Sequence, residues 1–284
     1  MKLASFLHEG AEGFGLVRDD LLHDLTGVVP SGARTLAEAL AHDGMKALPA
    51  AADRKSRELR LHDIALLPPI PMPGKIICVG LNYRTHIAES GYAAPKRPML
   101  FARFANSLVG HGGSLVRPRL SIDFDFEGEL AFVIGSPARH ATRDGALSHV
   151  AGYACFNDGS IRDYQLHTSQ FLPGKAFWRS GSFGPWLVTP DETGDPSGLT
   201  LTTRLNGDVM QAASLDDLLF DVPALIEYIS GITMLDPGDV IVTGTTGGVG
   251  FARDPKVWME PGDKVEVEID RVGTLVNGVV DEAA

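Results

Sequence analysis

The sequence predicts a β-rich α+β fold, with a small α/β domain over residues 1–70 and a larger domain over residues 71–284. The boundary rests on the proline cluster of residues 68–74, which neither a helix nor a central strand can continue through. The β-rich class rests on many short apolar or alternating segments with few helical patterns between them. Mixed sheets that curl around a core fit this pattern better than a doubly wound parallel sheet.

The smaller predicted domain combines short strands with one helical segment. Residues 2–28 alternate between apolar segments and glycines, which is typical of short strands joined by tight turns. Residues 35–54 are rich in Ala and Leu at helical spacing, so a helix is expected there. A strand is expected at residues 64–67, just before the prolines.

The larger domain is predicted to consist mainly of strands. Apolar or alternating runs mark these strands at residues 75–79, 99–104, 123–135, 151–156, 240–242 and 265–270. Short helical segments are expected at residues 80–91, around residues 142–149 and after residue 157. Asp221 as N-cap and Pro223 in the first turn predict one further helix, which Gly231 is expected to end.

Composition and charge limit the classes of partner. Of the 284 residues, 44% are hydrophobic and 21% are charged, which is ordinary for a globular protein with a large core. The formal net charge of −11 argues against nucleic acid or an anionic membrane as the main partner. No run approaches the ~18 apolar residues of a membrane span, and the N-terminus lacks a secretory pattern. Cys78 and Cys155 lie in separate apolar runs, so we expect buried free thiols and a cytoplasmic protein.

Residues 123–135 contain the strongest local signal for a binding site. With the two-residue period of a strand, Asp125, Glu127 and Glu129 fall on one face of an otherwise apolar segment. Carboxylates this close repel each other and burial adds to the cost, so a bound cation would relieve both. The alternative is a solvated acidic strand end, which is the commoner situation for an isolated Glu-x-Glu.

A third carboxylate strengthens the cation hypothesis. Asp158 follows an apolar strand, so its side chain can project into a cleft at the strand end. Glu127, Glu129 and Asp158 have no Cys or His at ligand spacing, and such an all-oxygen set suits a hard cation. We therefore predict a site for Mg²⁺, with Mn²⁺ as the other candidate.

Basic and amide side chains follow Asp158 at regular spacing. Arg162 and Gln165 lie four and seven residues after it, the spacing of one helical face, and Lys175 follows a Pro-Gly pair. These residues could face the same cleft. The alternatives are a solvated Lys175 and a local ion pair between Arg162 and Asp163.

Two more segments carry possible chemistry. His86 and Glu89 are three residues apart in a helical segment, so the carboxylate could orient the imidazole as a general base, although an exposed surface pair is the simpler interpretation. The glycine-rich residues 242–250 lack the pattern of a nucleotide-binding loop. Their N–H groups and the Thr245 hydroxyl could instead hold a carboxylate. No Gly-x-Ser-x-Gly motif is present, which argues against a serine hydrolase.

Taken in order, these motifs resemble the fumarylacetoacetate hydrolase superfamily, over roughly residues 72–280. The matching motifs are Gly-Leu-Asn-Tyr-x-x-His-x-x-Glu from Gly80, Asp-Phe-Glu-x-Glu-Leu-Ala-x-Val-Ile-Gly from Asp125, Asn-Asp-x-x-x-Arg-Asp-x-Gln from Asn157, Gly-Lys from Gly174, Gly-Pro-Trp from Gly184 and Pro-Gly-Asp-Val-Ile-x-Thr-Gly-Thr from Pro237. The resemblance, closest to acylpyruvate hydrolases and 2-hydroxyhepta-2,4-diene-1,7-dioate isomerases, implies a mixed β-roll catalytic domain, a homodimer and a Mg²⁺ or Mn²⁺ cofactor.

The resemblance also implies roles for individual residues. Glu127, Glu129 and Asp158 would be the metal ligands. His86 and Glu89 would form a catalytic pair on a lid, and Lys175 would also be catalytic; the substrate contacts would be Arg162, Gln165 and Thr245. The chain departs from many members at Trp178, where they have Asp, and at Thr246, where they have Pro. Both departures are expected near the substrate.

For the reaction, the resemblance implies a small 2-oxo acid substrate and an enolate intermediate. The main expectation is hydrolysis of a C–C bond in a 2,4-dioxo acid to pyruvate and a carboxylic acid, since the His86–Glu89 pair could activate water. The alternatives are decarboxylation of oxaloacetate and isomerisation of an unsaturated 2-oxo acid, which pass through the same enolate. A binding protein with a dead site is disfavoured because every expected polar residue is present.

Overall fold

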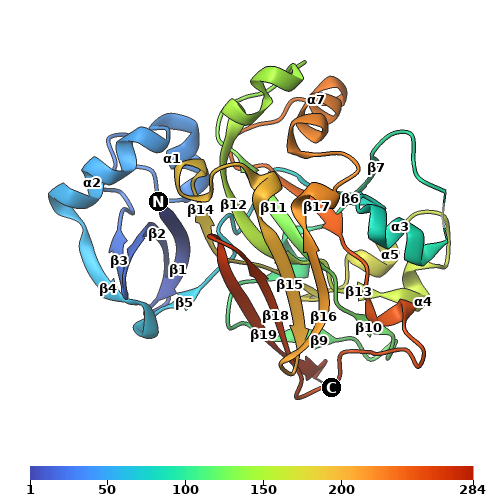
Figure 1. Cartoon of the computed structure of the whole chain (residues 1–284). Helices are drawn as coiled ribbons and strands as arrows, with labels where there is room; N and C mark the ends of the chain where they lie inside the picture. The colour runs from blue at the N-terminus through green and yellow to red at the C-terminus, as the bar shows by residue number, and fades with distance from the viewer. Residues whose placement is uncertain (92, 284) are drawn as a thin grey trace.

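The computed structural model describes residues 1–91 and 93–283. A long mixed sheet contains strands from residues 2–66 and strands from residues 76–245 (Figure 1). The spatial order of its main path is β4 (Arg57–Arg60), β3 (Leu21–Asp24), β2 (Ala11–Arg18), β1 (Lys2–His8), β14 (Gly181–Val188), β12 (Val150–Asn157), β11 (Gly128–Ile134), β17 (Val240–Thr245), β6 (Ile76–Gly80) and β7 (Met99–Ala102). Two short strands lie off this path: β5 (Ala65–Leu66) pairs with β1, and β8 (Leu108–Val109) pairs with β14. The β-rich α+β class predicted from the sequence is confirmed.

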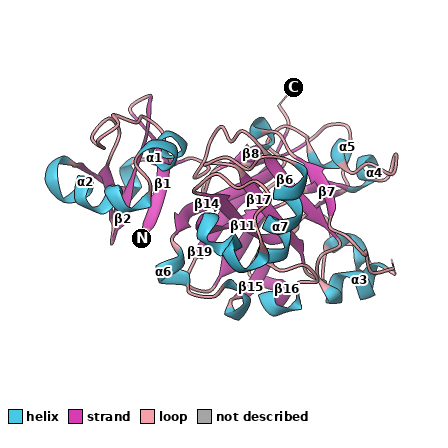
Figure 2. Cartoon of the chain, turned by 90° about the horizontal axis from the view of Figure 1, so that it is seen from above, coloured by secondary structure: helices cyan, strands magenta, loops and turns pink. Residues whose placement is uncertain are grey.

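Two smaller sheets complete the β structure. The larger of them has the order β16 (Asp208–Ser214), β15 (Thr200–Leu205), β18 (Lys264–Ile269), β19 (Gly273–Asp281) and β9 (Leu115–Arg117). The smaller pairs β10 (Phe124–Asp125) with β13 (Ser160–Ile161). Seen from above, the strands of the larger part of the chain are surrounded by short helices and loops, and the N-terminal strands β1 and β2 lie to one side (Figure 2).

The α-helices are short except for one. They are α1 (Leu36–His42), α2 (Leu48–Lys55), α3 (Arg84–Ser90), α4 (Arg162–Gln165), α5 (Leu172–Lys175), α6 (Pro190–Thr193) and α7 (Val222–Ile232). The 3₁₀ turns are η1 (Met45–Ala47), η2 (Leu61–Asp63), η3 (Ala105–Ser107), η4 (Arg143–His149), η5 (Pro196–Gly198), η6 (Leu215–Asp217) and η7 (Gly250–Ala252). Asp221 caps α7 by accepting a hydrogen bond from the Ala224 N–H, as its sequence position predicts.

Strand β11 lies at the centre of the hydrophobic core because both of its faces are apolar. Ala131 and Val133 pack into a cluster that includes residues of α1 and α2. Leu130, Phe132 and Ile134 pack on the opposite face, with residues of α7 and β18. This double burial fixes the register of the strand, so its polar first residues are held at one end of the core.

The acidic segment 123–135 is not one strand, which corrects the sequence prediction. It divides into β10 and β11, with Glu127 between them. The Glu127 N–H donates to the Asn157 side chain at 3.0 Å, and its carbonyl accepts from the Asp158 N–H at 2.8 Å. These two bonds replace a regular ladder at Glu127, and Asp125 is not among the carboxylates that converge at the strand end.

Three helix predictions were also inexact. The segment 35–54 is two helices with a 3₁₀ turn between them, because Gly44 takes a left-handed φ of 67° that an α-helix cannot include. Gly231 lies inside α7 instead of ending it. The helix expected near residues 142–149 is the 3₁₀ turn η4. These three misses concern a boundary or a helix subtype. Among the longer strands, β14, β15, β16 and β19 were not predicted at all.

Two simpler expectations are confirmed. Cys78 and Cys155 are buried free thiols. Among the helices of residues 1–91 and 93–283, none has the length and apolar character needed to cross a bilayer.

Candidate active site and metal centre

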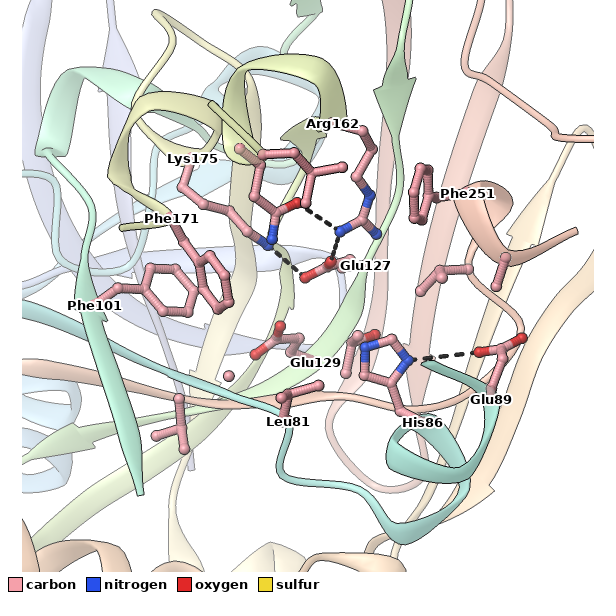
Figure 3. A pocket seen from close by; sticks show the side chains of 17 residues that line it. Leu81, His86, Glu89, Phe101, Glu127, Glu129, Arg162, Phe171, Lys175 and Phe251 are labelled. Carbon is pink, nitrogen blue, oxygen red and sulfur yellow. Dashed lines mark hydrogen bonds and ion pairs between the residues drawn. The ribbon is translucent and has the colours of Figure 1, made fainter. Parts of the chain in front are cut away.

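A cavity of about 300 Å³ lies where β6 and β17 end and β11 begins (Figure 3). Helices α3, α4 and α5 contribute the rest of its polar wall. The predicted site residues in this wall are His86, Glu89, Glu127, Glu129, Arg162, Gln165, Lys175 and Thr245. The ninth predicted residue, Asp158, is fully buried behind the wall. The fold thus brings together groups that are far apart in the sequence. An example is the Glu89 carboxylate and the Gly248 N–H, which are 159 residues apart.

Three carboxylates form a compact buried cluster. The ligand atoms of Glu127, Glu129 and Asp158 all lie within 4.8 Å of one another. Antiparallel pairing of β11 with β12 places Gly128 opposite Asn157, so Glu127 and Asp158 come together just beyond the paired ends. The three residues are at most 5% exposed. Strand pairing thereby holds together charges that would otherwise repel.

Buried cations compensate part of this negative charge. Lys175 Nζ lies 2.6 Å from Glu127 Oε2 and 2.7 Å from Asp158 Oδ2. Arg162 contacts Glu127 Oε1 at 2.6 Å (Figure 3). Glu129 has no cationic partner among the ion pairs of the described residues, and its Oε2 accepts a hydrogen bond from the Gly244 N–H at 2.6 Å.

The pKa shifts follow from this uneven compensation. Burial raises the pKa of Glu129, and the carboxylates of Asp158 and Glu127 raise it further. Burial alone would also raise the pKa of Glu127, but Lys175 and Arg162 lower it to about 2. For Lys175, burial is outweighed by Asp158 and Glu127, so its pKa is raised and the ammonium persists.

The cluster fits a divalent cation. Its donors are carboxylate oxygens alone, and they converge within 4.8 Å. Glu129 contributes a buried negative charge that no described side chain neutralises by an ion pair, so a cation there would lower the cost of burial. Oxygen-only sets are preferred by hard cations and are unusual for structural zinc.

His86 and Glu89 face this cluster from α3, on the opposite wall (Figure 3). His86 Nδ1 lies 3.5 Å from Glu89 Oε2. Both carboxylate oxygens of Glu89 are 3.0 Å from the Gly248 N–H. Burial lowers the pKa of His86, although Glu127 opposes part of that shift, so the imidazole is neutral at pH 7. A neutral imidazole beside a carboxylate can accept a proton from a bound molecule.

The start of α3 is fixed by Asn82. This fully buried amide donates to the Phe220 carbonyl at 2.9 Å and to the Thr243 carbonyl at 2.8 Å. Its oxygen accepts from the Phe220 N–H at 2.8 Å. The Asn of the Gly-Leu-Asn-Tyr motif therefore anchors the His86 helix to β17 and to the segment before α7.

Arg162 is held in place by a fourth buried carboxylate, Asp125. Arg162 Nε donates to Asp125 Oδ2 at 2.8 Å. The same carboxylate accepts the N–H groups of Gly250 and Phe251 at 2.8 and 3.0 Å. Arg162 in turn donates to Gln165 Oε1 at 2.8 Å, which leaves the Gln165 amide N–H₂ to face the cavity. Asp125 thus organises Arg162 and the cavity wall at Phe251, and it is not part of the cation cluster.

We predict that Asp125→Asn lowers the free energy of unfolding by about 3–5 kcal/mol, because a buried charge pair loses one partner. The asparagine N–H₂ group would also face N–H donors of Gly250 and Phe251, which bind the carboxylate in the wild type. Urea unfolding measures the effect. The control is Asp281→Asn, which removes the partner of Arg117 in an ion pair whose aspartate is 60% exposed. The control should cost less than about 1 kcal/mol, and equal costs would contradict the role given to Asp125.

Two expectations about the substrate end need correction. Trp178 does not line the cavity; it is 55% exposed and borders a separate cleft with Arg179 and His111. Thr246 is buried, and its hydroxyl contacts Thr85 at 3.2 Å outside the cavity wall. Trp178 lies in the turn that follows α5, in which the Ser180 N–H donates to the Phe177 carbonyl, and the sequence pattern does not reveal this turn.

The glycine-rich loop does hold carboxylates, but they are the protein's own. Its N–H groups at Gly248 and Gly250 bind Glu89 and Asp125. Thr245 lines the cavity, yet its hydroxyl donates to the Gly128 carbonyl and accepts from Gln211 at 2.8 Å. A substrate contact by Thr245 therefore remains a prediction. Its hydroxyl has no proton left to donate and can only accept one further hydrogen bond.

Sequence reasoning missed Arg103, the third buried cation of the site. Its side chain is fully buried and lies 2.5 Å from Asp158 Oδ1. A signal was available, because Arg103 is the one charged residue of the apolar segment 99–104.

The chain belongs to the fumarylacetoacetate hydrolase family. The family model described as "Fumarylacetoacetate (FAA) hydrolase C-terminal" matches residues 75–280, most of the chain. The fold and the convergent acidic cluster agree with this membership.

The chain is similar to several individual family members. The chain is 41% identical over 232 residues to oxaloacetate tautomerase fahd2, mitochondrial, of Xenopus laevis, covering 81% of this chain and 73% of the relative. Fumarylacetoacetate hydrolase from Exiguobacterium antarcticum has a similar structure, with a TM-score of 0.88 and 34% identity over 99% of this chain and 100% of the other. Maleylpyruvate hydrolase from Sphingobium sp. SYK-6, solved with manganese(II) and pyruvate, gives a TM-score of 0.82 and 28% identity over 100% of both chains.

The comparisons do not establish the cellular location or the oligomeric state of this chain. The Xenopus protein is named as mitochondrial, so a cytoplasmic location for this chain has no support from it. The homodimer is likewise still a prediction.

Proposed function

We propose that this protein catalyses the keto–enol tautomerisation of a small 2-oxo acid of the oxaloacetate type. The observation that carries the proposal is the two-sided cavity: the carboxylate cluster with Lys175 forms one wall, and neutral His86 forms the other. One wall suits an oxygen that becomes negative, and the other suits a carbon that loses a proton. The name of the Xenopus relative, an oxaloacetate tautomerase, supports the same reaction.

We further propose Glu127, Glu129 and Asp158 as ligands of Mg²⁺ or Mn²⁺. A bound divalent cation supplies Lewis-acid stabilisation of the negative charge that develops on a 2-oxo group. The oxygen-only donor set supports either ion, and the manganese(II) of the Sphingobium structure supports Mn²⁺ as one of the two.

The proton transfers fall to His86. Because Nδ1 faces Glu89, Nε2 is the nitrogen left for the substrate. Nε2 accepts the proton of C3, the C–H electron pair becomes the C2=C3 double bond, and the carbonyl electron pair moves onto the 2-oxo oxygen. Glu89 stabilises the imidazolium, and the Lys175 ammonium stabilises the oxygen. Return of the proton from His86 to that oxygen gives the enol, so no atom is gained or lost.

Hydrolysis of an acylpyruvate, the main expectation from the sequence, is the second candidate. The orientation of Gln165 favours it, because Arg162 occupies the amide oxygen and leaves the N–H₂ group free to donate to a tetrahedral oxyanion. The Sphingobium structure, a maleylpyruvate hydrolase, also supports it. The name of the Xenopus relative, an oxaloacetate tautomerase, instead supports an oxaloacetate-type substrate, as in the decarboxylase alternative expected from the sequence.

The test compares three reactions of one enzyme preparation with Mg²⁺, with Mn²⁺ and with a chelator. Decay of the ultraviolet absorbance of freshly dissolved enol-oxaloacetate reports tautomerisation. Pyruvate release from oxaloacetate reports decarboxylation, and pyruvate release from acetylpyruvate reports hydrolysis. We expect metal-dependent acceleration of enol decay that exceeds both rates of pyruvate release. Fast pyruvate release from acetylpyruvate without accelerated enol decay would overturn the proposal in favour of hydrolysis.

A further inference from the structure

Arg103 lies just after β7, and its guanidinium is buried within the protein and away from the cavity. Its side chain is 0% exposed, and it does not contribute to the cavity wall. A buried guanidinium is costly unless its charge and its donors are all matched. The contacts of Arg103 therefore indicate which groups its buried charge stabilises.

All five N–H donors of Arg103 are engaged. One terminal nitrogen donates to Asp158 Oδ1 at 2.5 Å and to the Gly159 carbonyl at 3.0 Å. The other donates to Ser180 Oγ at 2.7 Å and to the Ser107 carbonyl at 3.5 Å. Nε donates to Ser107 Oγ at 3.1 Å. No donor is left for a substrate, which separates Arg103 from Arg162 and Lys175.

Asp158 is the only charged group that Arg103 contacts among the described residues. Its two oxygens are divided between two cations: Oδ1 faces Arg103, and Oδ2 faces Lys175 at 2.7 Å. Ser107 and Ser180 hold the guanidinium from the side away from Asp158. The rotation of the Asp158 carboxylate is thereby fixed by a residue that lies just after β7 and forms no ion pair with Glu127 or Glu129 among the described residues.

We propose that Arg103 is a positioning residue for the metal centre, which presents Asp158 Oδ2 to the cation together with Glu127 and Glu129. This inference rests on the proposed metal site. Groups that hold metal ligands from behind typically change affinity by about 10–100-fold when they are removed. Charge alone predicts the opposite sign, because deleting a cation beside a cation site should tighten metal binding.

The test is calorimetric titration of metal-free protein with Mn²⁺, using wild type, Arg103→Met and Arg103→Lys. We expect Arg103→Met to raise the Mn²⁺ dissociation constant about 10–100-fold. Lysine can still donate to Asp158 Oδ1, so Arg103→Lys should restore most of the affinity. At saturating Mn²⁺ the kcat of Arg103→Met should return to within a few-fold of wild type, because Arg103 does not reach the substrate.

Controls separate this role from a purely structural one. Arg117→Met removes an arginine from an ion pair with Asp281 at the surface and should leave Mn²⁺ affinity unchanged. An unchanged or tighter Mn²⁺ dissociation constant in folded Arg103→Met would overturn the inference. If Arg103→Met does not fold, Ser180→Ala, which removes one anchor of the guanidinium, replaces it: a weaker affinity supports the inference and an unchanged one overturns it. Failure of wild type itself to bind Mn²⁺ would instead remove the proposed metal site, and the inference with it.

Discussion

Glu129→Gln is expected to abolish tight binding of a divalent cation and to reduce kcat/KM about 10³-fold or more. The amide keeps the size of the side chain, and its oxygen can still accept the Gly244 N–H. What disappears is the one buried carboxylate of the cluster that has no cationic partner among the described ion pairs. Loss of the cation would remove several kcal/mol of transition-state stabilisation, and about 4 kcal/mol corresponds to the stated factor.

Calorimetric titration with Mn²⁺ and rates of enol decay measure this effect together. Glu268→Gln is a suitable control, because Glu268 lies on β18 and pairs with Arg204 away from the cavity. Circular dichroism of both variants should match that of wild type. Wild-type turnover in folded Glu129→Gln would remove Glu129 from the metal site.

His86→Asn is expected to lower kcat about 10²–10⁴-fold, while Mn²⁺ affinity stays unchanged. Burial lowers the pKa of His86, and only the neutral ring can accept a proton. The wild-type rate should therefore be highest where His86 is neutral and should fall as the pH drops through its lowered pKa. In His86→Asn this acid limb should be absent. A pH–rate profile of both proteins checks the assignment, and an unchanged acid limb in the variant would contradict it.

Glu89→Gln provides a graded control for the same pair. Glu89 raises the pKa of His86, so removing its charge should move the acid limb to still lower pH. The glutamine oxygen can continue to accept the Gly248 N–H, so the helix position should be retained. A limb that does not move would mean that Glu89 does not influence His86.

The sequence could predict those strands that carry a clear local pattern, and it indicated eight residues that the fold brings to one cavity. Strands β14, β15, β16 and β19 were not predicted. Alternation along residues 128–134 gave the two buried faces of β11, and spacing after Asp158 placed Arg162 and Gln165 together. The break at Glu127 could not be predicted, because the bonds that cause it come from Asn157 and Asp158, some 30 residues away.

Ion pairs between residues that are far apart in the sequence could not be predicted either. Asp125 looked equivalent to Glu127 and Glu129 in a regular strand, yet its carboxylate binds Arg162 and the loop at Gly250. Arg103 reaches Asp158 across 55 positions of sequence. Local periodicity shows on which face a charge lies, but it does not show which opposite charge the fold brings to that face.

The charge balance of the centre has a consequence for the order in which ligands arrive. Asp125, Glu127, Glu129 and Asp158 are buried against three buried cations, Arg103, Arg162 and Lys175. With all four carboxylates ionised, the protein alone has one negative charge in excess, in keeping with the raised pKa of Glu129. An acid anion entering that environment meets repulsion. With a divalent ion present the excess becomes one positive charge, equal and opposite to a single carboxylate. Electroneutrality thus favours ordered addition, with the ion first and the acid second.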